Sequence, residues 1–422
     1  MTHIQLITYN LLQWLIILIC LPILIPLACI HPKRKQTFFK RLGFQNIPLH
    51  QKPVWVHALS VGEVISAFPI IEAMRKKWPQ KAIVFSASTL AGYEMAQNMR
   101  DQVQNIIYYP YDFIFSVHLI TKKVNPSIFI LVESDIWPNF LTYLYRKKIP
   151  SILLNARLSK ESYRGYRLLK WFIQPTLNTF RSICVQSDIQ KNRFEKFVRD
   201  PLKTVVSGNV KFDQKRHQLS PSEIEFLRKK SGLTKSTPVI VAGSTHEGEE
   251  EILINIFSSL LNPYPDLKMI IVPRDPTRAK DIQTICLEHH LPVSLYSRQK
   301  RFEKILIVDQ MGVLGELYAL ANIAFVGGSM VAEGGHNPLE PALMAKPVVF
   351  GYDMHDFPEI SRRLVNEKAA FQVQNANELY QIFQLLLDNT ELASQYGLKG
   401  LDIIKESQGA VQQSINVIKH YF

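Results

Sequence analysis

Short apolar segments alternate with helix-like stretches along most of this chain, and that alternation restricts the possible folds more than any other feature. The first series of predicted strands covers 54–58, 82–88, 106–109, 127–134, 151–156 and 182–186. The second series covers 238–244, 268–274, 292–297, 304–310, 323–328 and 347–351. Strands that alternate with helices form mostly parallel sheets with helices on both faces. The sequence therefore predicts an α/β protein with two doubly wound, Rossmann-like halves.

The alternation breaks near residues 205–214, and this break suggests where the first half ends. A chain of 422 residues is long enough for about two to three domains with cores of their own. We predict a first domain over 33–207, a hinge over 208–219 and a second domain over 220–422. The end of the second domain, from Asn377 onward, has a helical pattern.

The N-terminus contains an apolar segment, Leu11 to Ile30, that has no charged residue. A helix of that length spans ~30 Å, about the hydrocarbon core of a bilayer. Pro22 and Pro26 would kink this helix, so partial insertion remains an alternative. Basic residues follow at once, and by the positive-inside rule they place the rest of the chain on the cytoplasmic side: Lys33, Arg34, Lys35, Lys40 and Arg41. We predict a single membrane anchor over 1–32.

The formal net charge of +13 suits an anionic partner, such as nucleic acid, an acidic membrane surface or a phosphorylated lipid. No nucleic-acid-binding module is recognisable, so we expect no nucleic-acid partner. The cysteines form no CxxC pair, and no His, Asp or Glu cluster has metal-ligand spacing. Neither GxxxxGK[ST] nor GxGxxG with a following ribose acid is present, which disfavours ATPases and dehydrogenases.

In the first half, acidic residues follow two predicted strands, where parallel sheets bind their ligands. Glu63 comes just after Ser60 at the start of a predicted helix, whose dipole favours an ionised carboxylate that can act as a base. The alternative is a glutamate that only complements the helix dipole. Glu133 ends the strand 127–134, and Trp137 follows it. An acid and a tryptophan there suit a sugar site, but also an ordinary capped helix.

In the second half, the strand ends carry groups that suit an anion. Ser244 and Thr245 lie at a strand-to-helix turn and can hold phosphate or sugar oxygens. Arg274 follows another strand and suits a phosphodiester. Lys211, in the hinge, is a further cation. The acids after Thr245 read as a solvated first helical turn: Glu247, Glu249, Glu250 and Glu251.

The most informative segment is 323–341, which reads as a strand, two glycine pairs and a helix start. Asn337 is a good N-cap and Pro338 suits the first helical position. Such a loop is an anion site, but Glu340 in the first turn would repel phosphate. Glu340 fits better as an acceptor for ribose hydroxyls, or as a simple complement to the dipole. His57, His246 and His336 read as lone, hydrogen-bonding histidines.

Taken together, these motifs resemble one family, the bacterial 3-deoxy-D-manno-octulosonic acid (Kdo) transferases. The resemblance runs in order from about Lys33 to about Gln408, through HALSVGE, ESDIWPN, LNARLS, GNVKFD, GSTHEGEEE, VPRDPTR and FVGGSMVAEGGHNPLEPA. It implies a GT-B fold with two Rossmann-like domains facing a central cleft. It also implies a CMP-Kdo donor bound by the second domain. The acceptor would be the lipid A precursor lipid IVA, at the cytoplasmic face of the inner membrane.

The resemblance also assigns roles to individual residues. Glu63 would be the general base, and Glu133 and Lys211 would stabilise the transition state. CMP would be held by Pro273, Arg274, Met311, Gly312, Val313, Asn337, Pro338, Leu339 and Glu340. Three positions depart from the family pattern, namely Asp135, Asp275 and Val313.

The implied reaction is an inverting glycosyl transfer that needs no cofactor or metal, because Arg274, Lys211 and a helix N-terminus can meet the charge on the leaving phosphate. One alternative is another GT-B protein, either a nucleotide-sugar transferase or a 2-epimerase. A different alternative is a non-catalytic, membrane-tethered basic protein that binds an anionic surface.

Overall fold

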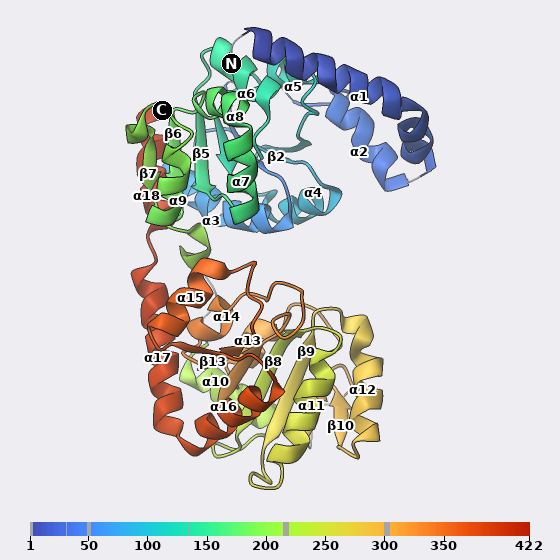
Figure 1. Ribbon diagram of the computed structural model, residues 1–422, viewed down its shortest axis with the longest axis vertical. Helices are drawn as coiled ribbons and strands as arrows, with labels where there is room; N and C mark the ends of the chain where they lie inside the picture. Colours follow the sequence, from blue (N-terminus) through green and yellow to red (C-terminus); the bar gives the residue numbers. More distant parts are fainter. Residues whose placement is uncertain (1–2, 31, 49–51, 134, 214–218, 299–303) are drawn as a thin grey trace. The chain divides into compact units, whose positions relative to one another are not determined.

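The computed structural model describes residues 3–30, 32–48, 52–133, 135–213, 219–298 and 304–422, without the side chains of 3, 17, 20–30 and 32–36. The chain divides into two compact units (Figure 1). Unit 1 consists of Met1–Lys215 and Ser407–Phe422, and unit 2 consists of Arg216–Glu406. Part of the predicted hinge, 214–218, lies outside the described residues.

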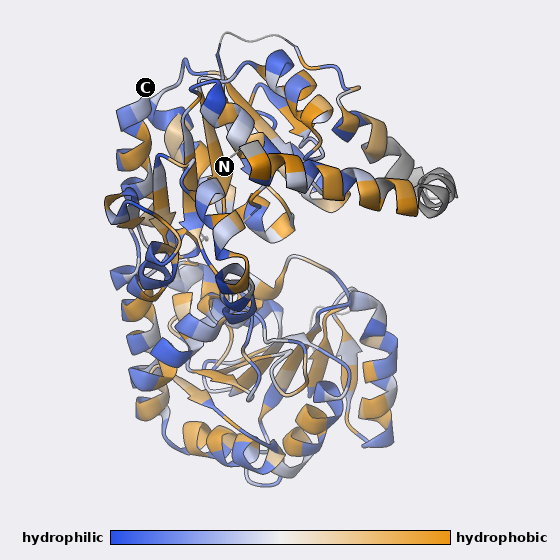
Figure 2. Ribbon diagram, turned by 45° about the horizontal axis from the view of Figure 1, so that its top comes forward, coloured by the Kyte–Doolittle hydropathy of each residue, from blue (hydrophilic) through white to orange (hydrophobic). Residues whose placement is uncertain are grey.

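Unit 1 is built on a parallel sheet with the strand order β3-β2-β1-β4-β5-β6-β7. The strands are β1 Val54–Ala58, β2 Ile83–Ala87, β3 Asn105–Tyr108, β4 Ile128–Val132, β5 Ser151–Ala156, β6 Ser182–Val185 and β7 Thr204–Val206. Every residue of β1, β2, β4 and β5 is buried, because helices cover both faces of the sheet. Figure 2 shows these strands as hydrophobic, whereas the surrounding helices carry both kinds of residue.

The helices of unit 1 follow the strands and cover the sheet. They are α3 Val61–Lys77, α4 Leu90–Ala96, α5 Ile114–Val124, α6 Pro138–Arg146, α7 Lys160–Leu168, α8 Lys170–Leu177, α9 Asp188–Glu195 and α18 Ala410–Ile418. The last helix, α18, packs on α3 (Figure 1). Ile415 and Ile418 join the same core cluster as Val56 and Ile70. Residues 407–422 therefore belong to unit 1, which differs from the predicted second domain over 220–422.

The N-terminal segment of unit 1 forms two helices, α1 His3–Ile30 and α2 Pro32–Leu42. α1 is docked through polar side chains: Tyr9 donates to Asp112 at 3.0 Å, and Asn10 exchanges two hydrogen bonds with Asn139 at 2.9 and 3.0 Å. Within the described ranges, no helix is both long and apolar enough to cross a membrane. The predicted anchor over 1–32 also includes residues and side chains that lie outside the described part.

Unit 2 repeats the architecture with the strand order β10-β11-β9-β8-β12-β13-β14. The strands are β8 Val239–Thr245, β9 Lys268–Pro273, β10 Val293–Leu295, β11 Ile305–Ile307, β12 Ile323–Val326, β13 Val348–Phe350 and β14 Ala370–Gln372. The helices are α10 Pro221–Lys230, α11 Glu249–Leu260, α12 Ala279–Glu288, α13 Leu314–Tyr318, α14 Leu339–Leu343, α15 Pro358–Asn366, α16 Ala376–Asp388 and α17 Thr390–Glu406.

The predicted fold class, two α/β domains with parallel sheets, is confirmed. All the predicted strands form, with ends that shift by a few residues. Two strands were missed, β7 and β14, and each is a three-residue strand at the edge of its sheet. An edge strand is partly exposed, as Val205 and Val206 are, so it does not produce the apolar run by which a buried strand is recognised.

Candidate functional site

Glu63 lies at the beginning of α3, shortly after the interior strand β1, in a buried position. Its side chain is turned back over the strand end, where Oε2 accepts a hydrogen bond from the backbone N–H of Leu59 at 2.5 Å. Only 7% of the residue is exposed. The predicted turn and helix start are therefore present, and the carboxylate is held at the carboxyl end of the sheet.

Glu133 lies beside this turn, at the end of β4, with a left-handed backbone conformation (φ +72°). Its Oε1 accepts hydrogen bonds from Ser66 of α3 at 3.0 Å and from Asn155 of β5 at 3.2 Å. Lys211 Nζ lies 3.9 Å from the same oxygen. The structure thus brings together Glu133 and Lys211, which are far apart in the sequence.

Asn155 was not predicted as part of the site, although it orders two of its members. Its amide donates to Glu133, while its Oδ1 accepts the backbone N–H of Val210, next to Lys211, at 3.2 Å. Asn155 also has a positive φ of 54°. A polar residue inside the otherwise apolar predicted strand 151–156 was the signal that could have identified it.

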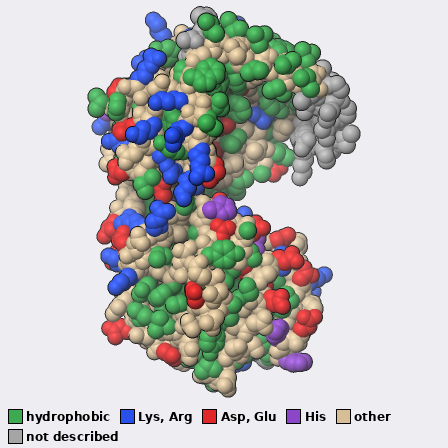
Figure 3. Space-filling view, in the orientation of Figure 1, with side chains coloured by type: hydrophobic (Ala, Val, Ile, Leu, Met, Phe, Trp, Pro, Cys, Tyr) green, Lys and Arg blue, Asp and Glu red, His purple; other side chains and the backbone are tan. Residues whose placement is uncertain are grey.

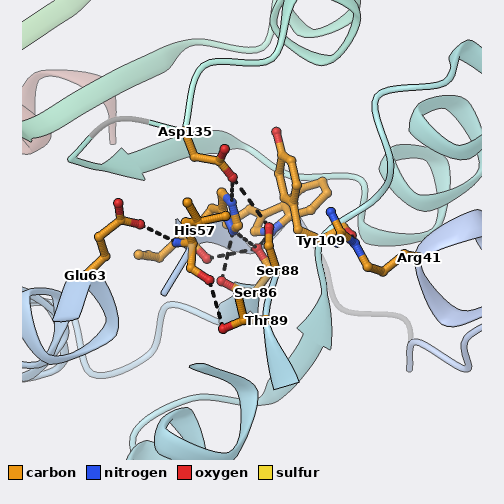
Figure 4. A network of polar contacts seen from close by, with 11 residues as sticks. Arg41, His57, Glu63, Ser86, Ser88, Thr89, Tyr109 and Asp135 are labelled. Carbon is orange, nitrogen blue, oxygen red and sulfur yellow. Dashed lines mark hydrogen bonds and ion pairs between the residues drawn. The ribbon is translucent and has the colours of Figure 1, made fainter. Parts of the chain in front are cut away.

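A second polar network lies beside Glu63 and centres on His57 of β1 (Figure 4). His57 Nε2 is 2.9 Å from Asp135, and Nδ1 is 3.0 Å from both the carbonyl and the hydroxyl of Ser86. The imidazole stacks on Tyr109, with ring centroids 3.7 Å apart. The predicted hydrogen-bonding role of His57 is confirmed, whereas its carboxylate partner was not anticipated.

The pKa values of two carboxyls at this end of the unit 1 sheet, Glu63 and Asp135, are shifted in opposite directions. Burial raises the pKa of Glu63 to about 7, and the charge of Glu133 adds to this effect. Burial also acts to raise the pKa of Asp135, but the hydrogen bond and charge of His57 outweigh it, so that pKa lies below its usual value. Near neutral pH, Asp135 is therefore ionised while Glu63 can gain or lose a proton.

In unit 2, the glycine loop after β12 wraps around a carboxylate of the protein itself. Glu249 accepts backbone N–H bonds from Gly328, Ser329 and Met330 at 2.6 to 2.9 Å, and from His246 at 3.0 Å. It is fully buried. Three amides of the loop that the sequence predicted as an anion site are thus occupied by Glu249.

The prediction of a solvated acidic turn is therefore wrong for Glu249 and Glu250. Glu250 is also fully buried; it accepts the hydroxyl of Thr245 at 3.0 Å and pairs with Arg278 at 3.3 Å. The hydroxyl of Thr245 thus donates its hydrogen to a carboxylate of the protein itself. Ser244 is half-buried, with a φ of +56°. Runs of glutamate usually lie in solvent, and nothing in their spacing indicates which members are buried.

His246 and His336 are a pair and not the lone histidines that were predicted. Their Nε2 atoms are 2.8 Å apart, so one ring donates and the other accepts. Burial, and then the positive charges of His246 and Arg274, lowers the pKa of His336 to about 4. Arg274 itself is exposed after the buried Pro273, and its backbone N–H donates to Thr245 at 2.9 Å. An exposed positive charge, that of Arg274, therefore lies at the carboxyl end of β9.

The remaining predicted donor-site residues follow β11 and β12 at the same edge of the sheet. Met311 and Gly312 are exposed, and Val313 directly precedes α13. α14 begins at Leu339, one residue later than predicted, and Asn337 accepts the backbone N–H of Leu339 at 3.2 Å. Pro338 and Leu339 are buried, and Glu340 is in the first turn as expected.

The described part of the chain contains no group of three or more His, Cys, Asp or Glu side chains that is placed to hold a metal ion. That no metal is needed stays a prediction. The carboxyl ends of the strands thus carry two different sets of groups. Unit 1 has acids and a lysine, and unit 2 has an exposed arginine, a histidine pair and glycine turns.

Comparison with known proteins gives consistent matches. Residues 36–214 match a family model described as 3-deoxy-D-manno-octulosonic-acid transferase (kdotransferase). A 3-deoxy-D-manno-octulosonic acid transferase of Haemophilus influenzae is 31% identical over 96% of this chain and 97% of the relative. One from Rickettsia bellii is 28% identical over 87% and 88%. The structure of a UDP-GlcNAc 2-epimerase from Neisseria meningitidis is similar in fold, with a TM-score of 0.60, 14% identity, and coverage of 88% of this chain and all of that one.

Proposed function

Because this chain belongs to the family of Kdo transferases, which are glycosyltransferases of lipopolysaccharide core synthesis, we propose that it transfers Kdo from CMP-Kdo to a glucosamine hydroxyl of the lipid A precursor lipid IVA. The observation that carries the proposal is Glu63, a buried carboxyl at a strand end whose pKa is near 7. A group that titrates near the working pH is suited to general-base catalysis.

In the proposed reaction, Glu63 takes the proton of the acceptor hydroxyl. The hydroxyl oxygen forms a bond to the anomeric carbon of Kdo, and the bond from that carbon to the CMP phosphate breaks. The electron pair of that bond leaves with the phosphate. Because the attack is a single displacement from the opposite side, the anomeric configuration inverts.

Glu133 and Lys211 are proposed to stabilise the transition state. Their contact brings a cation next to a carboxylate whose position is set by Ser66 and Asn155. Fixed charges of this kind stabilise developing charge without reorganisation, which is often the largest contribution to catalysis. Together with Arg274, Lys211 supplies positive charge in place of a divalent cation.

Unit 2 is proposed to bind the CMP part of the donor, with contributions from Met311–Val313 and Asn337–Glu340. Glu249 already occupies the amides after β12, so the phosphate is assigned to the exposed guanidinium of Arg274. Glu340 is assigned to the ribose hydroxyls, because a carboxylate accepts hydrogen bonds and repels phosphate.

Because the proposed acceptor is a lipid, we propose that the protein acts at the anionic, cytoplasmic surface of the inner membrane. The surface of unit 1 supports this location. α1 exposes large apolar side chains along its described part: Ile4, Ile7, Leu11, Leu12, Trp14, Leu15, Ile16, Leu18 and Ile19. α8, which contacts α1 through Trp171 and Phe172, and α7, which packs on α8, expose apolar and basic side chains. These are Leu168, Trp171, Lys160, Arg164, Arg167 and Lys170. Figure 3 shows lysine and arginine side chains gathered on this face. Apolar and basic groups together favour an interface with acidic headgroups, so we propose that α1 anchors the protein there.

Mass spectrometry tests this function directly. Purified protein incubated with CMP-Kdo and lipid IVA should increase the acceptor mass by one or more Kdo units, and free CMP should inhibit more strongly than UDP. Inhibition by UDP alone would favour a UDP-sugar transferase or a 2-epimerase. An acceptor mass that stays unchanged would contradict Kdo transfer.

The membrane assignment has its own test. Replacing Leu11, Leu12 and Leu15 by serine leaves the contacts of Tyr9 and Asn10 in place while it removes exposed apolar area. Activity should then fall on acceptor in anionic vesicles and change little on detergent-dispersed acceptor. Equal loss in both assays would show that these residues serve the fold instead.

A further inference from the structure

His57 is a polar side chain in the centre of an apolar core. It lies on β1, between β2 and β4 in the sheet of unit 1, is fully buried, and is flanked by the aromatic rings of Tyr109 and Phe129. Placing a polar ring there costs free energy unless its nitrogen atoms are hydrogen-bonded. Both nitrogen atoms are bonded, one to Ser86 and one to Asp135.

These contacts fix the orientation of the imidazole and its proton. An ionised carboxylate can only accept, so Nε2 of His57 carries the hydrogen that bonds Asp135. Tyr109 covers one face of the ring, and its backbone carbonyl accepts from Arg41 Nε at 3.0 Å. Ser88 makes a longer contact of 3.4 Å with the same Asp135 oxygen. The carboxylate of Asp135 is thus held by a ring that has little freedom to move.

The segment held in this way also carries Glu133. Asp135 follows Glu133 by two positions, and the left-handed φ of Glu133 is unfavourable for a residue with a side chain. Such a conformation persists only where its surroundings fix it. Ser66 and Asn155 hold the Glu133 carboxylate, and His57 holds the chain just beyond it through Asp135.

We propose that His57 and Asp135 form a positioning pair for glycosyl transfer: the imidazole fixes an ionised carboxylate next to Glu63 and orients the segment that carries Glu133. The pair acts through Glu63 and Glu133 and touches no reacting atom. This inference rests on the proposed function, because it assigns a task within that reaction.

The pair has an electrostatic consequence that a purely structural role lacks. Among the described residues, the charges of Glu133 and Asp135 act on Glu63, and these two carboxylates pair with Lys211 and His57 respectively. Both carboxylates raise the pKa of Glu63, since a nearby negative charge disfavours a second one. Removing the Asp135 charge must therefore lower the Glu63 pKa, and the acid limb of the pH–rate profile then moves to lower pH.

The decisive variant is Asp135→Asn, which keeps an oxygen for His57 Nε2–H and loses only the charge. We expect its acid limb to move to lower pH, with a reduced plateau kcat and little change in the KM for CMP-Kdo. His57→Phe should reduce kcat by about 10- to 100-fold, and His57→Gln, which can still donate to Asp135, should recover part of that loss. Asp101→Asn, at an exposed position of the same unit, is the matched control and should behave like the wild type.

A second readout separates this inference from the proposed function. In protein labelled with ¹³Cδ-glutamate, the Glu63 signal, identified by its loss in Glu63→Gln, should titrate near pH 7 and at lower pH in Asp135→Asn. This measurement needs no substrate, so it stands even if no Kdo is transferred. The inference is overturned if Asp135→Asn leaves both the titration and the acid limb in place, including the case in which it only lowers the melting temperature.

Discussion

Glu63 in unit 1 and Glu249 in unit 2 occupy equivalent places in the order of elements along the chain. Each lies in the first turn of the helix that follows the first strand of its unit, and each is buried. Glu249 is surrounded by four backbone N–H groups, which satisfy its charge inside the protein. For Glu63, burial outweighs the hydrogen bonds of the turn and raises the pKa to about 7. One architecture thus produces a structural anion in one unit and a candidate base in the other.

The comparison shows that burial of an acid does not by itself indicate catalysis. The number of hydrogen-bond donors around the carboxylate determines whether its charge is stabilised or left available for proton transfer. In unit 2 the glycine loop supplies those donors, and in unit 1 the neighbours of Glu63 include two further carboxylates. This difference explains why acid–base chemistry is assigned to unit 1 and anion binding to unit 2.

The largest expected effect comes from Glu63→Gln, which removes the proposed base and keeps the shape of its side chain. Transfer should fall by about 10³-fold or more, while CMP binding stays unchanged. A raised carboxyl pKa destabilises the folded state as pH rises from about 4.5 through 7, because folding then opposes ionisation. The variant should therefore be at least as stable as the wild type at pH 8, as thermal unfolding at pH 5 and pH 8 can check. Retained turnover would exclude Glu63 as the base.

The equivalent change in unit 2, Glu249→Gln, should act on stability. Each oxygen of Glu249 accepts hydrogen bonds from two backbone N–H groups. In the glutamine variant an NH₂ group replaces one oxygen, so its hydrogens would face two backbone N–H groups that lose their acceptor. We expect a loss of about 2–4 kcal/mol in the free energy of unfolding. Glu251→Gln, at an exposed position of the same helix, is the control and should change little. A stable Glu249→Gln protein that no longer binds CMP would mean that this acid serves the ligand.

Arg274→Ala should weaken the affinity for CMP by about 10- to 100-fold, the effect of losing one charged hydrogen-bonded contact to phosphate. The titration of Glu63 should not change. The control is Arg278→Ala, because Arg278 pairs with Glu250 and Glu247 inside unit 2 and should affect stability instead. Isothermal titration calorimetry with CMP measures both variants. Equal affinities for Arg274→Ala and the wild type would remove this residue from the donor site.

Much of this could be predicted from the sequence, and the rest could not, for physical reasons. The buried strands and the acids at their ends were predictable, because a central parallel strand reads as an apolar run and Glu63 and Glu133 come directly after one. The pairing of His57 with Asp135, and of His246 with His336, depends on which strands are neighbours in the sheet. Spacing along the chain does not contain that information.

The burial of Glu249 illustrates the same limit. Its four donors come from the start of its own helix and from a loop about eighty positions later, and only the folded sheet brings them together. The docking of residues 407–422 on unit 1 is similar, since a helical pattern shows an apolar face but not the surface that covers it.

The smallest expected effects come from replacing one glycine in each unit by alanine. The two changes in stability compare how tightly the backbone is packed at Gly243 and at Gly62. Ala at Gly243, on the central strand of unit 2, would place its Cβ 2.1 Å from the Tyr318 hydroxyl, so we expect a loss of about 1–3 kcal/mol. Gly62, next to the candidate base Glu63, has no atom within 4 Å of the Cβ that an alanine would add. Because alanine is the better helix former, Gly62→Ala should stabilise the protein by about 0.5–1 kcal/mol and leave the Glu63 titration unchanged. Chemical denaturation resolves both changes in the free energy of unfolding. A loss of stability in Gly62→Ala would contradict the prediction, and would show that a side chain at this position disturbs the fold.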